Sequence, residues 1–201
     1  MPTEEKKEFI YEAALSLIDE SDDLSKIKVM DIAQKANIGK GTVYEYFNSK
    51  EQLIAEAITY MLKRWINHLE ESFADERSFK ENYTLMLESV LSLLEKKHRT
   101  ILGFISMSES GSHLYKSINT LMQESFEELQ KSNLRFYEKI VDKSVEEGVV
   151  KEKPPLFDWY FAISSSILCV IIHEKHFEGD VGYSHKQIIE KAYNTYVKLL
   201  S

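Results

Sequence analysis

Apolar residues recur every three to four positions along most of this 201-residue chain, and this spacing constrains its fold more than any other feature. It matches the turn of an α-helix and gives each helix one apolar stripe. Glycine and proline, which interrupt helices, occur only 7 and 3 times, and no alternating strand pattern extends over a useful length. The sequence therefore predicts an all-α fold of about nine helices. The two clearest stripes are Phe9, Ile10, Ala13, Ala14, Leu17 and Ile18, and Leu53, Ile54, Ala57, Ile58, Met61, Leu62, Trp65, Ile66 and Leu69.

The composition is that of an ordinary soluble protein, with 43% hydrophobic residues, 29% charged residues and a formal net charge of −8. The single cysteine, Cys169, excludes an internal disulfide and favours a reducing cytoplasm. The longest apolar stretch, residues 156–172, contains Asp158 and three serines and is shorter than the roughly 20 residues of a membrane span. We interpret it as a buried helix and expect a cytoplasmic protein with no membrane segment.

A helix-turn-helix unit is predicted between residues 29 and 47. Residues 29–36 and 40–47 each fit a short helix, and residues 37–39 fit the turn between them. Asn37 tolerates the left-handed conformation that ends many helices, and Gly39 is an acceptable N-cap for the second helix. That second helix has the size that fits a DNA major groove. The side chains expected in the core are Val29, Ile32, Ala33, Ala36, Val43 and Phe47.

Further helices are expected in the rest of the chain. Ser49 and Gln52 form an S-x-x-Q capping box before a long helix, and Ser78 and Glu81 form another box. The expected helices span about residues 50–73, 78–97, 98–108, 118–147, 156–176 and 184–200.

Four short segments of the first 55 residues stand in a specific order and spacing: Ile10–Ala14 (IYEAA), Asp31–Ala33 (DIA), Gly41–Phe47 (GTVYEYF) and Ser49–Leu53 (SKEQL). In these segments the sequence resembles the TetR/AcrR family of bacterial regulators. It departs from the family at Asp22-Asp23, where glycine is common, so we expect a loop of different shape there. It also departs at Asn37 and Gly39, which keep the backbone geometry that the turn requires.

The resemblance implies a helix-turn-helix DNA-binding head at residues 1–49 and an effector-binding and dimerisation domain at residues 50–201. It implies a sequence-specific regulator, most simply a repressor that a small lipophilic effector releases from a palindromic operator. Lys28 and Lys50 are expected to meet phosphates, whereas packing beneath the helix remains an alternative for Tyr44. The residues implied at the surface of double-stranded DNA are Lys28, Lys40, Gly41, Thr42, Tyr44, Tyr46 and Lys50.

The charge of the head is unevenly distributed. Residues 1–50 hold seven lysines against ten acidic residues, whereas residues 25–50 hold five lysines against two. The acidic residues crowd into the first helix and the loop after it. A local positive face is what phosphate binding requires, so we expect DNA binding that is weaker and more salt-sensitive than that of a strongly basic protein.

The last two helices, about residues 156–177 and 184–200, are the expected homodimer interface. Residues 156–172 are apolar on more than one face, and a second copy would cover the face that its own chain leaves open. A central helix within one monomer is the alternative. A two-fold pair of heads also matches palindromic half-sites.

The middle helices are rich in methionine and aromatic side chains, which suit an adaptable apolar pocket. Packing in an ordinary hydrophobic core is the simpler interpretation of each single residue. The candidate effector-binding residues are Trp65, Met86, Phe104, Met107, Met122, Phe126 and Tyr160.

We expect no enzyme activity, no cofactor and no metal site. His173 and His176 have i, i+3 spacing, but no third ligand lies near them in the sequence, so a surface or interface pair is favoured. Two other functions stay open beside the effector-controlled repressor. One is a DNA-binding protein of the same fold that a protein partner controls, and the other is a helical adaptor or ligand carrier that has lost DNA binding.

Overall fold

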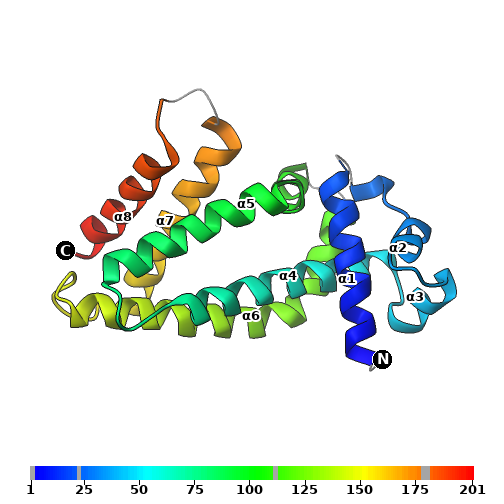
Figure 1. The fold of residues 1–201 in the computed structure, drawn as a ribbon, viewed down its shortest axis with the longest axis horizontal. Helices are drawn as coiled ribbons and strands as arrows, with labels where there is room; N and C mark the ends of the chain where they lie inside the picture. Colours follow the sequence, from blue (N-terminus) through cyan, green and yellow to red (C-terminus); the bar gives the residue numbers. More distant parts are fainter. Residues whose placement is uncertain (1–2, 22–23, 111–112, 178–181) are drawn as a thin grey trace. The chain divides into compact units, whose positions relative to one another are not determined.

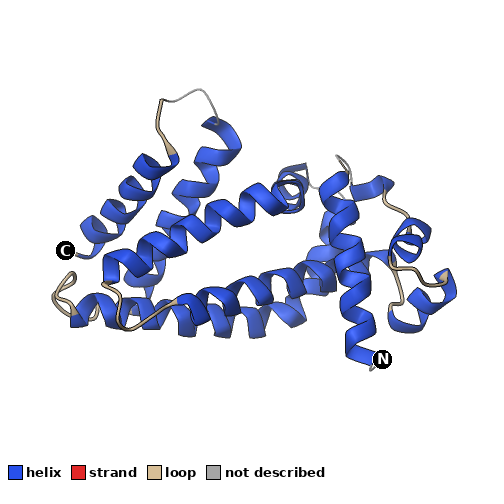
Figure 2. Cartoon of the chain, in the orientation of Figure 1, coloured by secondary structure: helices blue, strands red, loops and turns tan. Residues whose placement is uncertain are grey.

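The computed structural model describes the backbone of residues 3–21, 24–110, 113–177 and 182–201. Within these ranges it describes all side chains except those of residues 3, 95–110, 114–115, 122–126 and 175–177. The described backbone forms eight α-helices and one 3-10 helix without any strand, which confirms the all-α prediction (Figure 2). In chain order they are α1 (Thr3–Glu20), η1 (Leu24–Lys26), α2 (Val29–Lys35), α3 (Lys40–Tyr46), α4 (Lys50–Ser72), α5 (Phe79–Ser110), α6 (His113–Glu146), α7 (Leu156–Phe177) and α8 (His185–Leu200) (Figure 1).

Two predicted boundaries in the middle of the chain are wrong. The helices expected at residues 78–97 and 98–108 are the single helix α5, and the helix expected from residue 118 begins at His113. Residues 79–110 contain no proline, and ending a helix near Lys97 would leave up to four carbonyl groups without helical partners. A continuous helix satisfies these groups, so polar residues such as Lys96 and Lys97 do not interrupt it.

The first compact unit comprises Met1–Trp65 and Lys97–Gln130. Its buried core gathers the apolar stripes of α1 and α4 together with Ile32 of α2, Val43 of α3 and Ile118 of α6. Phe9 is a correction to the predicted α1 stripe, because 62% of its surface is exposed. Leu15 is buried instead. The stripe is therefore centred on the Ile10–Ile18 side of the helix and leaves Phe9 outside it.

The turns and caps of the head follow their predicted chemistry. Asn37 adopts a φ of 53°, in the left-handed region, and Gly39 is the N-cap of α3 with an extended backbone. At the start of α4, the Ser49 hydroxyl accepts a hydrogen bond from the backbone N–H of Gln52 at 3.0 Å. The Gln52 side chain accepts from the backbone N–H of Asn48 at 2.9 Å, one residue earlier than an ideal capping box requires. The sequence therefore determines both ends of the helix-turn-helix unit locally.

The second compact unit comprises Ile66–Lys96 and Lys131–Ser201. Within it α7 packs against α8, and the buried Ser166 hydroxyl donates to the backbone carbonyl of Ala192 on α8 at 3.0 Å. Helix α6 ends at Glu146, and Gly148 in the turn after it has a φ of 69°, the left-handed conformation that glycine adopts without strain. Ser184 caps α8, and its hydroxyl accepts from the backbone N–H of Gln187.

Helix α7 is less buried than the sequence predicts. Its residues 156–174 have a mean hydropathy of 1.6 and are long and apolar enough to cross a membrane, yet only 33% of them are buried within the chain. The buried side faces α8 and carries polar groups such as Ser166 and Glu174. The exposed large apolar side chains of α7 are Leu156, Phe157, Tyr160, Phe161, Leu168 and Ile172.

Two buried tyrosines of the second unit permit a matched test of packing. The Tyr196 hydroxyl donates to the buried Ser144 hydroxyl at 2.9 Å, whereas the Tyr83 hydroxyl has no hydrogen-bond partner among the described residues. Tyr196→Phe is expected to lower the free energy of unfolding by about 1 kcal/mol. Tyr83→Phe removes an unpaired polar atom and is expected to leave that free energy unchanged or to raise it. Urea denaturation of both variants measures the difference, and an equal loss in both would contradict the assignment.

Candidate DNA-binding site

Helix α3 has one buried face and one exposed face. Val43 and Phe47 point into the core of the first unit and are almost fully buried. Lys40, Gly41 and Tyr44 are exposed on the other side, with 48% of the Tyr44 surface accessible. The alternative that Tyr44 packs beneath the helix is therefore wrong. The helix presents a short polar and aromatic surface on a rigid apolar base.

Lys40 and Tyr44 form a local pair on this surface. The Lys40 Nζ lies 5.8 Å from the centroid of the Tyr44 ring, which is within the range of a cation–π contact. A Cβ placed on Gly41 would meet nothing within 4 Å, so the backbone there faces open space. Thr42 is half-buried. One face of a single helical turn thus carries a cation, an aromatic ring and an accessible backbone.

Tyr46 differs from the other predicted α3 residues. Its ring is half-buried, lies 6.4 Å from the Phe47 ring and packs against the core of the first unit. Part of its role is therefore structural, and its predicted contact with DNA stays a prediction.

The two lysines predicted to meet phosphates have different surroundings. Lys28 is the exposed N-cap residue of α2, and its backbone N–H donates to the Asp31 carboxylate at 3.3 Å. The Lys50 Nζ donates to the backbone carbonyls of Leu24 and Ser25, each at 3.0 Å. Lys50 therefore ties the start of α4 to η1. A phosphate contact by Lys50 stays a prediction. In this structure its ammonium group stabilises the contact between α4 and η1.

The positive charge of the head is smaller than the count of lysines indicates. Lys35, the last residue of α2, forms an ion pair with Glu20 of α1 at 2.5 Å. The hydrogen bond from Lys35 holds the pKa of Glu20 below its usual value. Sequence reasoning missed this pair, because the two residues are 15 positions apart and no motif links them.

The described candidate effector residues lie in both units, and their role in effector binding stays a prediction. Trp65 is half-buried in the first unit, and Met86 is buried in the core of the second. The Tyr160 ring lies on α7, partly exposed and 5.4 Å from the Tyr137 ring. The side chains of Phe104, Met107, Met122 and Phe126 lie outside the described residues.

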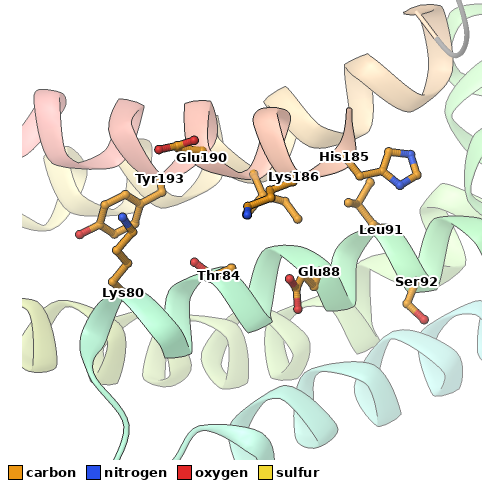
Figure 3. A pocket seen from close by; sticks show the side chains of 10 residues that line it. Lys80, Thr84, Glu88, Leu91, Ser92, His185, Lys186, Glu190 and Tyr193 are labelled. Atoms are coloured by element: carbon orange, nitrogen blue, oxygen red, sulfur yellow. The ribbon is translucent and has the colours of Figure 1, made fainter. Parts of the chain in front are cut away.

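A cleft of about 500 Å³ lies between α5 and α8 in the second unit, and none of the candidate effector residues lines it. Figure 3 shows Lys80, Thr84 and Glu88 on α5, and Lys186 and Tyr193 on α8, around this cleft. The Lys80 Nζ lies 5.2 Å from the centroid of the Tyr193 ring. The sequence offered no signal for this cleft, because its residues are mostly polar and lie on two helices that are far apart in the sequence.

The histidines considered for metal binding have another arrangement. His173 Nδ1 and His185 Nε2 lie 3.1 and 3.2 Å from the same Glu174 carboxylate oxygen. The His176 side chain lies outside the described residues. No group of three or more side chains suited to hold a metal is found among the residues that the structure describes.

Helix α3 is the second helix of the helix-turn-helix unit, and its exposed face lies on a core that α1, α2 and α4 share. This arrangement defines a helix-turn-helix DNA-binding protein. A family model described as "Bacterial regulatory proteins, tetR family" matches residues 10–57. Residues 10–57 therefore form the N-terminal module of the TetR family of regulators, which places DNA binding in this part of the chain. This confirms the family resemblance noted in the sequence.

Two curated relatives come from Bacillus subtilis (strain 168). An uncharacterized HTH-type transcriptional regulator, YhgD, is 26% identical over 172 residues, which are 85% of each chain. The fatty acid metabolism regulator protein is 26% identical over 144 residues, covering 71% of this chain and 70% of the relative. Both are named as regulators, in agreement with the expectation that this chain is not an enzyme.

Solved structures share the fold over nearly the whole chain. The regulator FadR from Bacillus subtilis, solved in complex with stearoyl-CoA, has a TM-score of 0.61 at 21% identity and covers 96% of this chain and 97% of its own. The fatty acid degradation regulator FadR from Bacillus halodurans has a TM-score of 0.63 at 18% identity, with the same coverage. At these identities the likeness shows the fold alone.

Proposed function

We propose that this protein is a cytoplasmic, homodimeric repressor that binds a palindromic operator through α3 and is released from it by a small lipophilic effector. The observation that carries the proposal is the exposed pair of Lys40 and Tyr44 on α3, which Val43 and Phe47 anchor to the core from the opposite face. Lysine can reach guanine acceptors in the major groove, and an aromatic ring can contact bases or the sugar-phosphate backbone. Lys28 on α2 would add a phosphate contact.

The exposed side of α7 supports dimerisation. Phe157, Phe161, Leu168 and Ile172 fall within roughly 60° of arc around the helix at 3.6 residues per turn. The side of α7 that packs within the chain is opposite, near Ala162 and Ser166. A contiguous apolar stripe with no cover from its own chain is typical of an interface. A second copy is the occupant we assign, because a two-fold pair of heads matches the symmetry of a palindrome.

A long-chain acyl group is the effector class that we assign. Its support is the name of the fatty acid metabolism regulator and the stearoyl-CoA complex of a protein with the same fold. The proposed mechanism requires the ligand to bind the form that does not bind DNA more tightly than the form that does. A coupling of about 1–3 kcal/mol between the two sites is typical and would change operator affinity roughly 5–150-fold. By reciprocity, DNA would weaken acyl-CoA binding by the same factor.

Binding to the DNA upstream of the protein's own gene tests the proposal, with Tyr44→Ala as the site variant. Tyr183→Ala is the matched control, because Tyr183 is exposed to a similar extent (44% against 48%) in the second unit. We expect a saturable complex with two chains per site. Tyr44→Ala should weaken it roughly 5–150-fold, the range of about 1–3 kcal/mol for a base contact, and Tyr183→Ala should leave it unchanged.

Weak binding to every DNA sequence, with no effect of Tyr44→Ala, would contradict the repressor. Addition of stearoyl-CoA to the wild-type complex tests the effector separately. Release of DNA supports an acyl effector. If the complex persists with stearoyl-CoA and with shorter acyl-CoA molecules, control by a protein partner is favoured. Met86, a candidate effector residue, supports this alternative because it is buried in the core.

A further inference from the structure

A half-buried carboxylate in the first unit connects α1 with α4. Glu56 lies on α4, and one of its oxygens, Oε2, accepts a hydrogen bond from the Tyr11 hydroxyl at 2.6 Å and another from the Lys7 Nζ at 3.3 Å. Both donors belong to α1. The other oxygen, Oε1, accepts from the Gln52 side-chain amide at 2.8 Å. Three donors thus converge on one acid from two helices.

The same contacts continue to the end of α3. The Gln52 amide group that donates to Glu56 also accepts, through its oxygen, from the backbone N–H of Asn48 at 2.9 Å. Asn48 follows Phe47, the C-cap residue of α3. A continuous chain of hydrogen bonds therefore runs from α1 through Glu56 and Gln52 to the backbone directly after the helix that presents Tyr44.

The aromatic neighbours of the carboxylate contact the same end of α3. The Tyr11 ring lies 5.7 Å from the Phe47 ring, and the Lys7 Nζ lies 5.5 Å from the centroid of the Phe47 ring. Both α1 side chains that donate to Glu56 thus also pack on Phe47. Moving either donor away from the carboxylate would remove a contact from the C-terminal end of α3.

The network is built for the charged form of the acid. Burial disfavours ionisation of Glu56, but hydrogen bonds from Tyr11 and Gln52 and the charge of Lys7 outweigh it and hold the pKa of the carboxyl below its usual value. Burial and the bond to Glu56 raise the pKa of Tyr11, so its hydroxyl remains a donor. A glutamine at position 56 would turn at least one amide N–H toward a donor, because an amide offers only one acceptor oxygen.

We propose that Glu56 is a positioning residue for DNA recognition, which fixes the C-terminal end of α3 against α1 through Gln52, Tyr11 and Lys7. This inference rests on the proposed DNA-binding function. Glu56 itself makes no contact with DNA in this scheme. Substitution of Glu56 changes the position of Tyr44 and Lys40, but it removes no cation that neutralises a phosphate.

The salt dependence of binding separates positioning from direct contact. Each phosphate contact contributes close to one unit to the slope of log affinity against log salt concentration. We expect Glu56→Gln to weaken binding about tenfold with the wild-type slope, and Lys28→Ala, which removes the proposed phosphate contact, to lower the slope by about one. The probe is a duplex that the wild-type protein selects from a random-sequence pool.

Tyr11→Phe removes only a hydroxyl and serves as the second variant, in case Glu56→Gln does not fold. The double variant is expected to bind no more weakly than Glu56→Gln alone, because both changes break one network. Hydrogen exchange at the Asn48 amide should be faster in both single variants. Glu12→Gln is the matched control, since Glu12 forms another α1–α4 ion pair, with Arg64 at 2.5 Å, that is exposed and has no bond to Asn48.

Wild-type affinity in both Glu56→Gln and Tyr11→Phe would overturn the inference, as would a lowered salt slope in either or an equal loss in Glu12→Gln. Additive losses in the double variant would overturn it too. If the wild-type protein selects no sequence from the pool, the proposed function itself fails, and that result is distinct from all of these.

Discussion

Phe161→Glu is expected to convert the proposed dimer into monomers and to weaken binding to the proposed operator by at least 100-fold. The Phe161 side chain is half-exposed in the single chain and lies in the middle of the apolar stripe on α7. A carboxylate there would be buried opposite its own symmetry copy, and burying an unpaired charge costs several kcal/mol. Monomers would then have to bind each half-site singly. Analytical ultracentrifugation measures the oligomeric state, and titration of the operator measures the affinity.

Leu85→Glu is the matched control for this change. Leu85 is an exposed apolar residue of α5 in the same unit, outside the α7 stripe. It is expected to leave both the dimer and the operator affinity intact. A dimer that persists in Phe161→Glu at micromolar concentration would show that α7 is not the interface, and dissociation in Leu85→Glu would place the interface on α5.

Phe47→Ala is expected to destabilise the first unit by about 3–5 kcal/mol, the usual loss for truncating a fully buried phenylalanine. Phe47 caps α3 and is almost fully buried, and it contacts the Tyr11 ring and the Lys7 ammonium group. Its removal leaves a cavity where α1 and α3 meet. Thermal unfolding followed by circular dichroism measures the loss, and operator binding should disappear when the head no longer folds.

Phe9→Ala provides the control for that measurement. Phe9 is also a phenylalanine of the head, but its side chain is largely exposed. Truncating it is expected to change the free energy of unfolding by no more than about 0.5 kcal/mol. Equal losses in the two variants would mean that the burial of Phe47 does not stabilise the head as proposed.

The helix-turn-helix unit was predictable from sequence because short-range chemistry determines it. Asn37 ends α2, Gly39 begins α3, and the four-residue spacing of Val43 and Phe47 directs both side chains inward. Each of these properties depends on a few consecutive residues. The exposed position of Phe9 was not predictable, because the edge of a helical stripe depends on which neighbours pack against it.

The contacts that organise the head were also outside the reach of sequence patterns. Glu56 and Tyr11 are 45 residues apart, and Lys50 reaches carbonyl groups of η1 some 25 residues earlier. Such pairs form only when tertiary packing brings charged side chains together, and no spacing rule signals them. The continuous course of α5 shows the same limit, because the need to satisfy backbone groups outweighs local polarity.

The ion pair between Lys35 and Glu20 has a consequence for how the protein is distributed in a cell. Affinity for random DNA comes almost entirely from lysine and arginine contacts with phosphates, and a chromosome offers about 10⁶–10⁹ such competing sites. Because α1 is acidic and Glu20 offsets one lysine of α2, the head has little charge with which to adhere to them. A larger share of the molecules therefore stays in free solution, so fewer copies are needed to occupy the proposed operator.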